Sequence, residues 1–412
     1  MRNAGIFVIM AFIVAVFACK ENPVRNKASM RTRNNPYSHD REFLEKHTEI
    51  IELKKDGSAI LIVPAWQGRV MTSTCEGDNG FSFGWINYEL IGSGDTLAHM
   101  NPYGGEERLW LGPEGGQYAL FFKKGDPFEY EYWQTPPAMD TQSFELVGQN
   151  DTHAVFNKEF KLTNYSGTEF DFLITRTIHL LGPEEISLLL LADMKGLNAV
   201  AYRSENVIEN TGEKKWTKAT GLVSIWMLGM FNPSPSAIVL IPVREGADDK
   251  YGPMVNDNYF GSISEDRLKI KDNIVYFKAD GRKRGKIGIP PLRSEGTMGS
   301  YDPDNNALTL LITDIPGDEH GFVNSSWELQ DKPYSGDALN SYNDGPLEDG
   351  SVMGPFYELE TSSPALSLLP GEEYIHTQIT VHIKGSPEDL DAICRNILGI
   401  SLADINVIFS NE

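Results

Sequence analysis

GPFYELETSSPALSLLPGEEYIHTQITVHI, residues 354–383, contains two stretches with the alternation of a β-strand, separated by a Pro370-Gly371 turn. Because successive side chains of a strand point to opposite faces, Glu358 and Glu360 share one face of the first stretch. We interpret the two stretches as neighbouring strands whose apolar face is buried and whose polar face is exposed or lines a groove. The polar face of the second strand carries Tyr374, His376, Gln378, Thr380 and His382.

The same alternation recurs along most of the chain and predicts an all-β fold. Strand-like runs are joined by clusters of Gly, Pro, Asn and Asp and by long loops such as 104–116 and 322–354. So many strands favour a large supersandwich of two antiparallel sheets packed face to face. One short capped helix is expected near the C-terminus, over residues 386–405. The expected strands are Ile50–Lys54, Ala59–Val63, Ala154–Leu162, Glu169–Leu180, Ile186–Leu191, Leu222–Met230, Ala237–Ile241, Ile274–Phe277 and Leu308–Ile312.

One charged residue falls on the apolar face of an expected strand. Arg176 has the same parity as Phe172 and Ile174. Burying an unpaired guanidinium costs a large free energy, so Arg176 requires a partner. We expect a structural ion pair rather than a contact with a ligand.

The N-terminus resembles a bacterial lipoprotein signal peptide. An apolar stretch, Ile6–Val16, is too short to span a bilayer, and the small Ala18 precedes Cys19. We expect cleavage after residue 18 and a lipid on the Cys19 thiol, with an ordinary secretory signal as the alternative. Residues 19–37 are polar and predict a flexible tether, followed by a single domain over 38–412. The predicted location is the cell envelope, facing either the periplasm or the exterior.

Charge and cysteine content exclude several classes of partner. The formal net charge of −22 argues against a nucleic-acid partner, which requires a basic surface. Cys75 and Cys394 are far apart, so we expect no disulfide and no zinc site built on paired cysteines. The sequence predicts no cofactor and no metal in the site. It leaves a structural calcium ion open, although Asp302–Asn306 lacks the ligands of a calcium loop.

A glycine-rich stretch, Asn101–Leu120, is a candidate carbohydrate-binding segment. Glycine lets the backbone approach a ligand, Trp110 offers a flat face for a sugar ring, and Arg108 offers a forked donor beside Glu114. The alternative is a glycine-rich turn in which Arg108 pairs with a glutamate and Trp110 packs in the core.

Two further loops contribute candidates. Trp327, Asn340, Asn343 and Asp344 are suited to recognising sugar hydroxyls, although Asn and Asp are also common in ordinary turns. The basic cluster Arg282–Lys286 is either a solvated loop or a subsite for uronate or sulfate groups.

Three motifs carry a family resemblance. They are GGxxRxWxxPE at 104–114, Ile208–Gly212, and Glu360-Thr361 followed by Leu-Pro-Gly-Glu at 369–372. Together they resemble the galactose-mutarotase-like (aldose-epimerase-like) supersandwich family, in particular an uncharacterised lipoprotein branch of Bacteroides-type bacteria. The resemblance spans roughly Ile50–Ile383. It implies a carbohydrate ligand and identifies Glu360 as the general base that acts on the anomeric hydroxyl.

The chain departs from the family where a histidine protonates the ring oxygen. The corresponding strand, Val223–Met227, offers Trp226 as an aromatic surface and has no titratable group. Proton transfer then requires another acid, such as His376 or His382. Glycoside cleavage is a second possibility, with Glu358 and Glu360 as the acid–base pair or either one facing Glu114 or Glu328.

Three functions therefore remain open from the sequence. The first is a carbohydrate-active enzyme, either epimerase-like or glycoside-cleaving. The second is a glycan-binding lipoprotein without activity. The third is a structural component of an outer-membrane complex.

Overall fold

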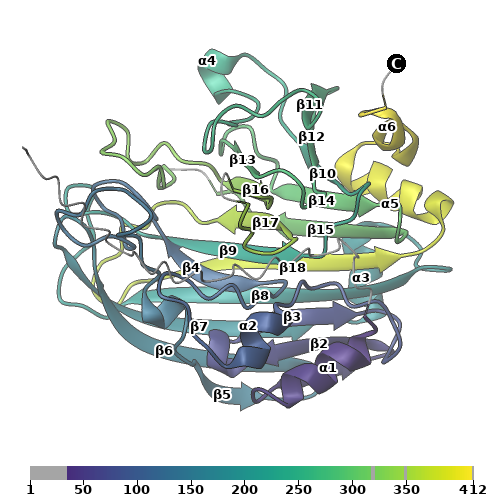
Figure 1. Cartoon of the computed structure of the whole chain (residues 1–412), viewed down its shortest axis with the longest axis horizontal. Helices are drawn as coiled ribbons and strands as arrows, with labels where there is room; N and C mark the ends of the chain where they lie inside the picture. The colour runs from purple at the N-terminus through teal and green to yellow at the C-terminus, as the bar shows by residue number, and fades with distance from the viewer. Residues whose placement is uncertain (1–34, 317–320, 348–349, 411–412) are drawn as a thin grey trace, which may run out of the picture. The chain divides into compact units, whose positions relative to one another are not determined.

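The computed structural model describes residues 35–316, 321–347 and 350–410, which belong to one compact unit, Thr32–Glu412 (Figure 1). The expected signal peptide, Cys19 and nearly all of the expected tether lie outside the described residues. Helix α1 (Tyr37–Glu45) includes the last residue of that tether. Tyr37 is buried, and its hydroxyl donates to Glu52 Oε1 at 2.9 Å, so the folded part begins earlier than expected.

One layer of the fold is a ten-stranded antiparallel sheet. In spatial order its strands are β11 (Leu268–Lys271), β12 (Ile274–Lys278), β10 (Ile238–Pro242), β14 (Thr297–Asp302), β15 (Ala307–Thr313), β18 (Glu373–Lys384), β8 (Asn198–Asn210), β7 (Glu169–Leu180), β6 (His153–Thr163) and β5 (Glu145–Gln149).

The facing layer consists of a five-stranded and a three-stranded sheet. An antiparallel bridge between Val70 and Glu107 connects their edges. The prediction of an all-β fold built from large antiparallel sheets is confirmed. The five-stranded sheet has the order β13 (Gly285–Ile289), β16 (Leu339–Asn343), β17 (Tyr357–Ser362), β9 (Ser224–Phe231) and β4 (Arg108–Gly112), and the three-stranded sheet has the order β1 (Ile51–Lys55), β2 (Ser58–Val63) and β3 (Arg69–Thr74).

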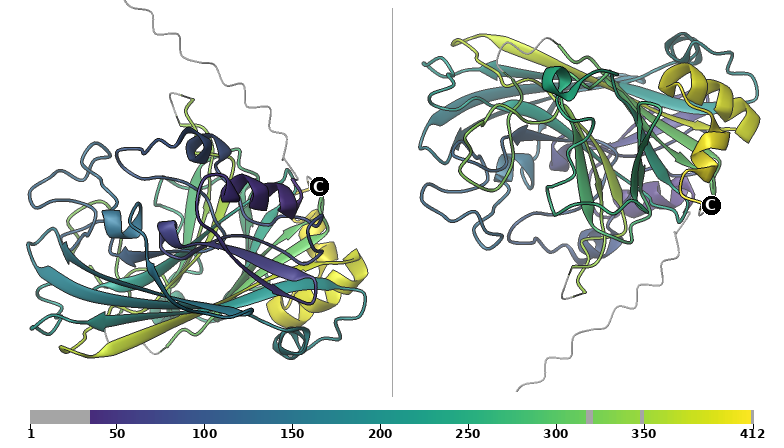
Figure 2. Two further views of the ribbon diagram at one scale, coloured as in Figure 1. Left: turned by 90° about the horizontal axis from the view of Figure 1, so that it is seen from below. Right: turned by 90° about the horizontal axis from the view of Figure 1, so that it is seen from above.

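Helices cover the outer face of the ten-stranded sheet around β18 (Figure 2). The expected C-terminal helix is present but consists of two helices, because Gly399 ends the first one in a left-handed conformation with φ 72°. The helices are α1, α2 (Tyr88–Ser93), α3 (Pro183–Leu190), α4 (Asp248–Tyr251), α5 (Pro387–Leu398) and α6 (Leu402–Val407), with short 3₁₀ turns at Pro64–Trp66 and Pro137–Met139.

One expected strand, Ile186–Leu191, is wrong, because this run lies in and just after α3. Pro183 stands in the first turn, where a missing N–H costs nothing. Glu185 accepts the Gly182 N–H at 2.8 Å and so caps the helix. Ile186 and Leu190 of this helix are buried and belong to one core cluster with residues of α5 and of the ten-stranded sheet.

The segment 354–383 does not form the expected hairpin. Its first strand, β17, pairs with β16 and β9, whereas its second strand, β18, pairs with β15 and β8 in the opposite layer. The alternation within each strand is as expected, but the polar face of β18 is neither exposed nor in a groove. His376, Gln378 and His382 are buried between the two layers. The opposite face of β18 is buried only in its second half, where Val381 and Ile383 pack in one core cluster with residues of α5, whereas Ile375 is exposed, so the expectation of a fully buried apolar face is wrong there.

A polar network in this interior ties the layers together. Arg176 of β7 forms an ion pair with Glu107 at 2.6 Å, and both side chains are fully buried. Arg176 also donates to the Gly68 carbonyl at 3.1 Å and to Asn206 Oδ1 at 2.7 Å, while Gln378 donates to Glu107 Oε2 at 2.8 Å. The prediction of a structural ion pair for Arg176 is confirmed.

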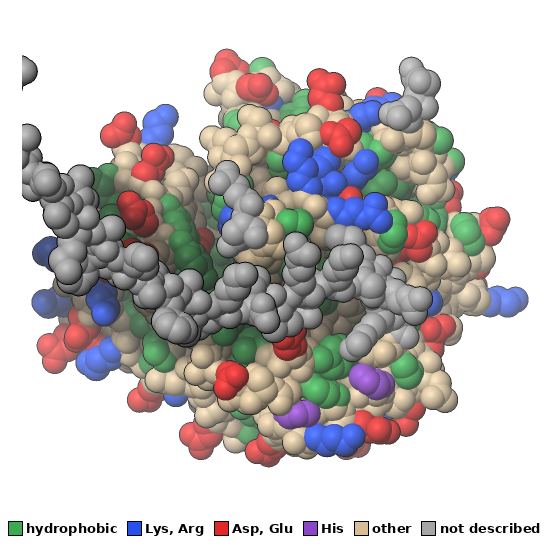
Figure 3. Space-filling model, in the orientation of Figure 1, with side chains coloured by type: hydrophobic (Ala, Val, Ile, Leu, Met, Phe, Trp, Pro, Cys, Tyr) green, Lys and Arg blue, Asp and Glu red, His purple; other side chains and the backbone are tan. Residues whose placement is uncertain are grey.

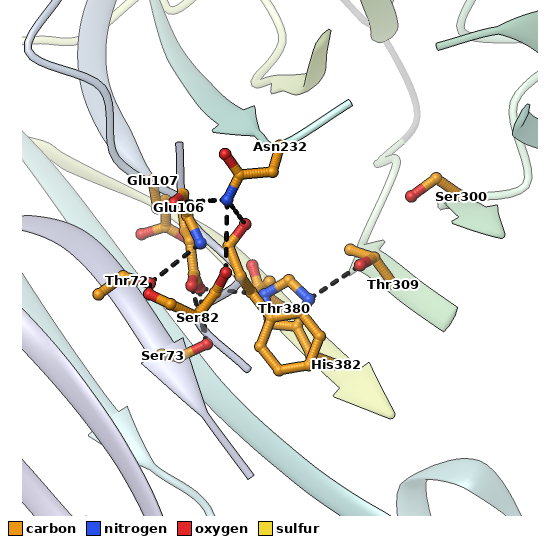
Figure 4. Close-up of polar contacts among 12 residues, drawn as sticks. Thr72, Ser73, Ser82, Glu106, Glu107, Asn232, Ser300, Thr309, Thr380 and His382 are labelled. Carbon is orange, nitrogen blue, oxygen red and sulfur yellow. Dashed lines mark hydrogen bonds and ion pairs between the residues drawn. The ribbon is translucent and has the colours of Figure 1, made fainter. Parts of the chain in front are cut away.

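His382 belongs to a second part of this network (Figure 4). Its Nδ1 lies 2.8 Å from Thr309 Oγ1, and its Nε2 lies 3.0 Å from Glu106 Oε2. The imidazole also stacks on Phe83, with 4.2 Å between ring centroids. His382 therefore connects β18, β15 and the segment before β4, and it does not face a ligand-accessible surface.

Cys75 and Cys394 are both buried free thiols, and burial raises the pKa of each to about 12. Within the described residues, no helix has the length and apolar character needed to cross a membrane.

The interior ion pair makes a testable prediction about stability. Arg176→Met leaves the Glu107 carboxylate buried without its cation, so we expect a loss of about 3–5 kcal/mol in the free energy of unfolding. Urea denaturation measures this loss. The control is Arg395→Met, which removes the surface pair of Arg395 with Asp391 and should cost far less. Similar losses in the two variants would contradict the structural role of the pair.

Candidate functional site

The face of the five-stranded sheet that points away from the interior gathers most of the predicted site residues. Across the strands, Arg108 aligns with Leu228, and Leu228 aligns with Glu360. Glu360 in turn aligns with Asn340 of β16. Because side chains at aligned positions share one face, β4, β9, β17 and β16 present this row on the same side.

Glu360 lies at the centre of this face and is fully buried. Its carboxylate accepts hydrogen bonds from Trp226 Nε1 at 2.9 Å and from Lys286 Nζ at 2.9 and 3.0 Å. Burial lowers the pKa of Lys286, but Glu360 and Glu114 outweigh this effect, and the net pKa is raised. Lys286 is therefore a fixed cation that compensates the charge of Glu360.

Glu358 lies two residues earlier on the same face and pairs with Arg108 at 2.8 Å. The Arg108 guanidinium also lies over the Trp110 ring, 4.3 Å from its centroid. Burial raises the pKa of Glu358 to about 7, although Arg108 opposes this shift. Burial and the Arg108 cation thus act on the Glu358 carboxyl in opposite directions.

Glu114 follows β4 and is only partly buried by surface area. Its backbone N–H donates to Ser325 Oγ at 3.1 Å. Burial raises the pKa of its carboxyl to about 7, Lys286 lowers it and Glu360 raises it. The face thus combines two carboxylates paired with cations, Glu360 and Glu358, with a Glu114 carboxyl whose pKa is about 7, an arrangement that suits acid–base catalysis.

A small polar cavity of about 30 Å³ lies beside Lys286. Asp337 accepts hydrogen bonds from Tyr259 Oη at 2.6 Å and Asn256 Nδ2 at 2.7 Å, and burial raises its pKa to about 6. The buried Ser224 hydroxyl finds no partner among the described residues. The cavity has room for a water molecule or two but not for a sugar ring. Its lining includes Ser224, Trp226, Tyr259, Lys286, Asp337 and Asn340.

The aromatic residues of the site mostly support it rather than face solvent. Trp110 is 3% exposed and donates its Nε1 proton to the Met139 carbonyl at 2.9 Å, so its face is not free for a sugar ring as expected. It packs against Trp226 and holds the Arg108 guanidinium. Trp327 is half-buried and stacks on Trp133, with 5.9 Å between centroids.

Two predicted binding residues have structural roles instead. Asn343 has the opposite parity to Asn340, and its side chain bonds the Gly281 N–H and the Lys283 carbonyl, at 2.9 Å each. Asp344 accepts from Tyr342 Oη at 2.8 Å and from the Gly354 N–H at 2.9 Å. Both side chains satisfy polar groups of the protein itself, Asn343 in the 281–283 segment and Asp344 on Tyr342 and Gly354, which explains why polar residues stand there.

His376 does not replace the histidine of the mutarotase-like family. Its Nε2 lies 2.9 Å from Thr361 Oγ1 in the interior, and Thr361 points to the opposite face of β17 from Glu360. Burial lowers the pKa of His376 to about 4, so the imidazole is neutral at physiological pH. Glu328 is exposed and has no described contact with Glu360.

The sequence did not identify Tyr259 and Asp337 as members of the site, and it considered Lys286 only as part of the basic cluster Arg282–Lys286. Lys286 is the one member of the basic cluster that faces the site, because it alternates with Ile287 and Gly285 on β13. The remaining cluster residues, Arg282, Lys283 and Arg284, are exposed, and Figure 3 shows one gathering of Lys and Arg on the face toward the viewer. Tyr259 and Asp337 carried no recognisable pattern.

No group of three or more His, Cys, Asp or Glu side chains in the described part of the chain is arranged to hold a metal ion.

Comparison with known proteins places the chain in a family. Residues 35–409 match the family of unknown function DUF6786. The chain belongs to this family. No curated protein matches its sequence.

Several solved structures are similar in fold. The Slr1438 protein from Synechocystis sp. PCC 6803 has a TM-score of 0.50 at 14% identity, covering 82% of this chain and 96% of that one. A putative aldose 1-epimerase from Escherichia coli K12 has a TM-score of 0.48 at 11% identity, covering 82% and 99%. A galactose mutarotase-like protein from Lactobacillus casei ATCC 334 has 0.45 at 12%, also covering 82% and 99%. At these identities the similarity concerns the fold alone.

The raised pKa of Glu114 predicts a pH-dependent stability. Its folded-state value of about 7 exceeds the ordinary 4.5, so the folded protein retains a proton that the unfolded chain releases. The stabilising contribution is complete below pH 4.5 and is lost as the pH rises to about 7. Glu114→Gln does not titrate, so it should gain stability relative to the wild type over this interval.

Urea unfolding at pH 4.5 and pH 7 tests this prediction, with Glu49→Gln at an exposed position as the control. A Glu114→Gln difference that is the same at both pH values would show that Glu114 has an ordinary pKa.

Proposed function

We propose that this protein binds a carbohydrate at the face built around Glu360 and carries out acid–base chemistry on it. One observation carries the proposal: a buried Glu360 carboxylate paired with Lys286 interacts electrostatically with the Glu114 carboxyl, whose pKa is about 7. A carboxylate held by a cation and a neighbouring carboxyl that keeps a proton near neutral pH can supply a base and an acid at the same pH.

The residues have distinct roles in this proposal. Glu360 accepts a proton from a sugar hydroxyl, as the resemblance to aldose epimerases implies for the anomeric hydroxyl. Glu114 donates a proton to the ring or glycosidic oxygen. Glu114 suits this role better than Glu358, because it is partly accessible, whereas Glu358 is held in a 2.8 Å ion pair by Arg108. Lys286 holds Glu360 in position and is not consumed.

Entry of a sugar ring requires a conformational change. The cavity beside Lys286 holds about 30 Å³, and Val323 and Ser325 form part of its wall. Outward movement of the loop that carries these two residues would open the cavity toward Glu114, whose N–H bonds Ser325. Closure of such a loop over the substrate would exclude water from the proton transfers.

Glycan binding without chemistry is the second candidate, and a specific observation favours it. Both oxygens of Glu360 already accept hydrogen bonds from Lys286, and one of them also accepts from Trp226. A carboxylate bonded in this way has less hydrogen-bonding capacity left to accept a proton from a substrate hydroxyl. Activity measurements on variants of Glu360 distinguish the two candidates.

The test begins with a thermal-shift screen of the chain from residue 20 against a panel of mono- and oligosaccharides, because a ligand that binds the folded state raises Tm. A sugar that raises Tm is then assayed for anomer interconversion by polarimetry and, as a nitrophenyl glycoside, for cleavage. Glu360→Gln should retain binding and lose at least about 100-fold in turnover. The control is Glu373→Gln, at an exposed position in the opposite layer.

Turnover unchanged in Glu360→Gln would rule this residue out as the base. Binding without turnover in the wild type would favour the second candidate. A panel in which no sugar raises Tm would contradict both candidates.

We also propose that the chain is exported and anchored in a membrane of the cell envelope through lipid on Cys19. Support comes from residues 1–19 of the sequence, which lie outside the described residues. In a bacterial host fed radiolabelled palmitate, the wild type should incorporate label and Cys19→Ser should not. Cys75→Ser is the control, since Cys75 is buried. Label retained in Cys19→Ser would contradict the proposal.

A further inference from the structure

A second, larger cavity of about 590 Å³ shares no lining residue with the cavity beside Lys286. Its walls come from residues 96–98, 120–124, 134–137 and 162–164. Phe121 lines this cavity and stacks on Trp133 at 5.9 Å between centroids, while Trp133 packs against Trp110 of the first site. The volume lies within the range of about 300–1,000 Å³ that is typical of small-molecule sites.

Two of the residues that line this cavity, Thr135 and Asp140, are buried and polar. Asp140 is 5% exposed and accepts hydrogen bonds from the Asn101 side chain at 2.7 Å and from the Asn101 N–H at 3.2 Å. Thr135 is 7% exposed, and its hydroxyl has no hydrogen-bond partner among the described residues. An unpaired buried hydroxyl costs free energy, so a water or a ligand group has to satisfy it. An anionic acceptor and a free hydroxyl together suit adjacent sugar hydroxyls.

The rim of the cavity has a different character. Lys123, Lys124 and Tyr132 line it and are exposed. Among the described residues that line the cavity, the charged ones are the two lysines and Asp140, so the lining contains two cations and one anion although the chain carries a net charge of −22. Tyr132 offers a ring for stacking against a sugar.

We propose that this cavity binds an acidic saccharide unit, carrying a uronate or sulfate group. The hydroxyls of the sugar bond Asp140 and Thr135, and its anionic group faces Lys123 and Lys124. The two lysines supply the preference for an anion, and the buried pair supplies the preference for a polyol. This inference is independent of the acid–base proposal, because no residue of the lining belongs to the face around Glu360.

Binding of glucuronic acid, glucose 6-sulfate and neutral glucose, measured by NMR titration or calorimetry, tests the inference. The wild type should bind at least one acidic sugar at least tenfold more tightly than glucose, and added salt should weaken this binding. The double variant Lys123→Glu/Lys124→Glu should lose at least tenfold in affinity for the acidic sugar. Lys214→Glu/Lys215→Glu changes an exposed lysine pair elsewhere by the same charge and should bind as the wild type does.

Thr135→Val provides a second, isosteric probe. The hydroxyl makes no hydrogen bond within the described protein, so its removal should leave Tm unchanged or raise it while weakening acidic-sugar binding several-fold. Glu360→Gln should bind the acidic sugar as the wild type does, which separates this site from the first.

Three outcomes would overturn the inference. They are the absence of saturable binding of either acidic sugar, equal affinity for glucose, and unchanged affinity in Lys123→Glu/Lys124→Glu.

Discussion

The buried ion pair between Arg176 and Glu107 is the constraint on which the site depends. It joins the ten-stranded sheet to the edge of β4, and its desolvation is offset by hydrogen bonds from Gln378 to Glu107 and from Arg176 to Asn206. Because side chains alternate along a strand, holding Glu107 inward turns Arg108 outward. Arg108 then meets Glu358, 250 residues later in the sequence. The interior network and the candidate site therefore lie on opposite faces of the chain where β4 begins.

Strand alternation was predictable from the sequence, but strand pairing was not. The pattern around Glu358 and Glu360 placed both carboxylates on one face, and the parity of Arg176 required a buried partner; both features are found. The pattern around His376 and His382 resembled an exposed face because its residues are polar. They are instead buried, since partners from distant strands satisfy them: Thr361 for His376, and Thr309 with Glu106 for His382. Such partners are invisible to local periodicity.

The misassigned helix and the missed site residues have similar causes. An apolar run such as 186–191 fits a buried strand or a buried helix equally well, and Pro183 with Glu185 were the local signals that favoured a helix. Lys286 contacts Glu360, and Asp337 contacts Tyr259. Lys286 lies on β13 and Asp337 just before β16, and the pairing of these two strands cannot be read from the local sequence. Asn343 was predicted in the site because asparagine suits both hydroxyl recognition and turns, and its parity relative to Asn340 is what separates the two roles.

The acid–base chemistry that we propose has no histidine in the site and would depend on the balance of carboxyls and cations there. Four carboxyls, those of Glu114, Asp337, Glu358 and Glu360, share two cations, Lys286 and Arg108. Lys286 is committed to Glu360 and Arg108 to Glu358, so Glu114 and Asp337 have no direct cation. Burial then favours their neutral forms, and their pKa values rise to about 7 and about 6. Because the site has more carboxyls than cations, Glu114 can keep a proton at a pH where Glu360 is ionised and paired with Lys286. In this proposal Glu114 supplies the proton that a histidine supplies in the mutarotase-like family.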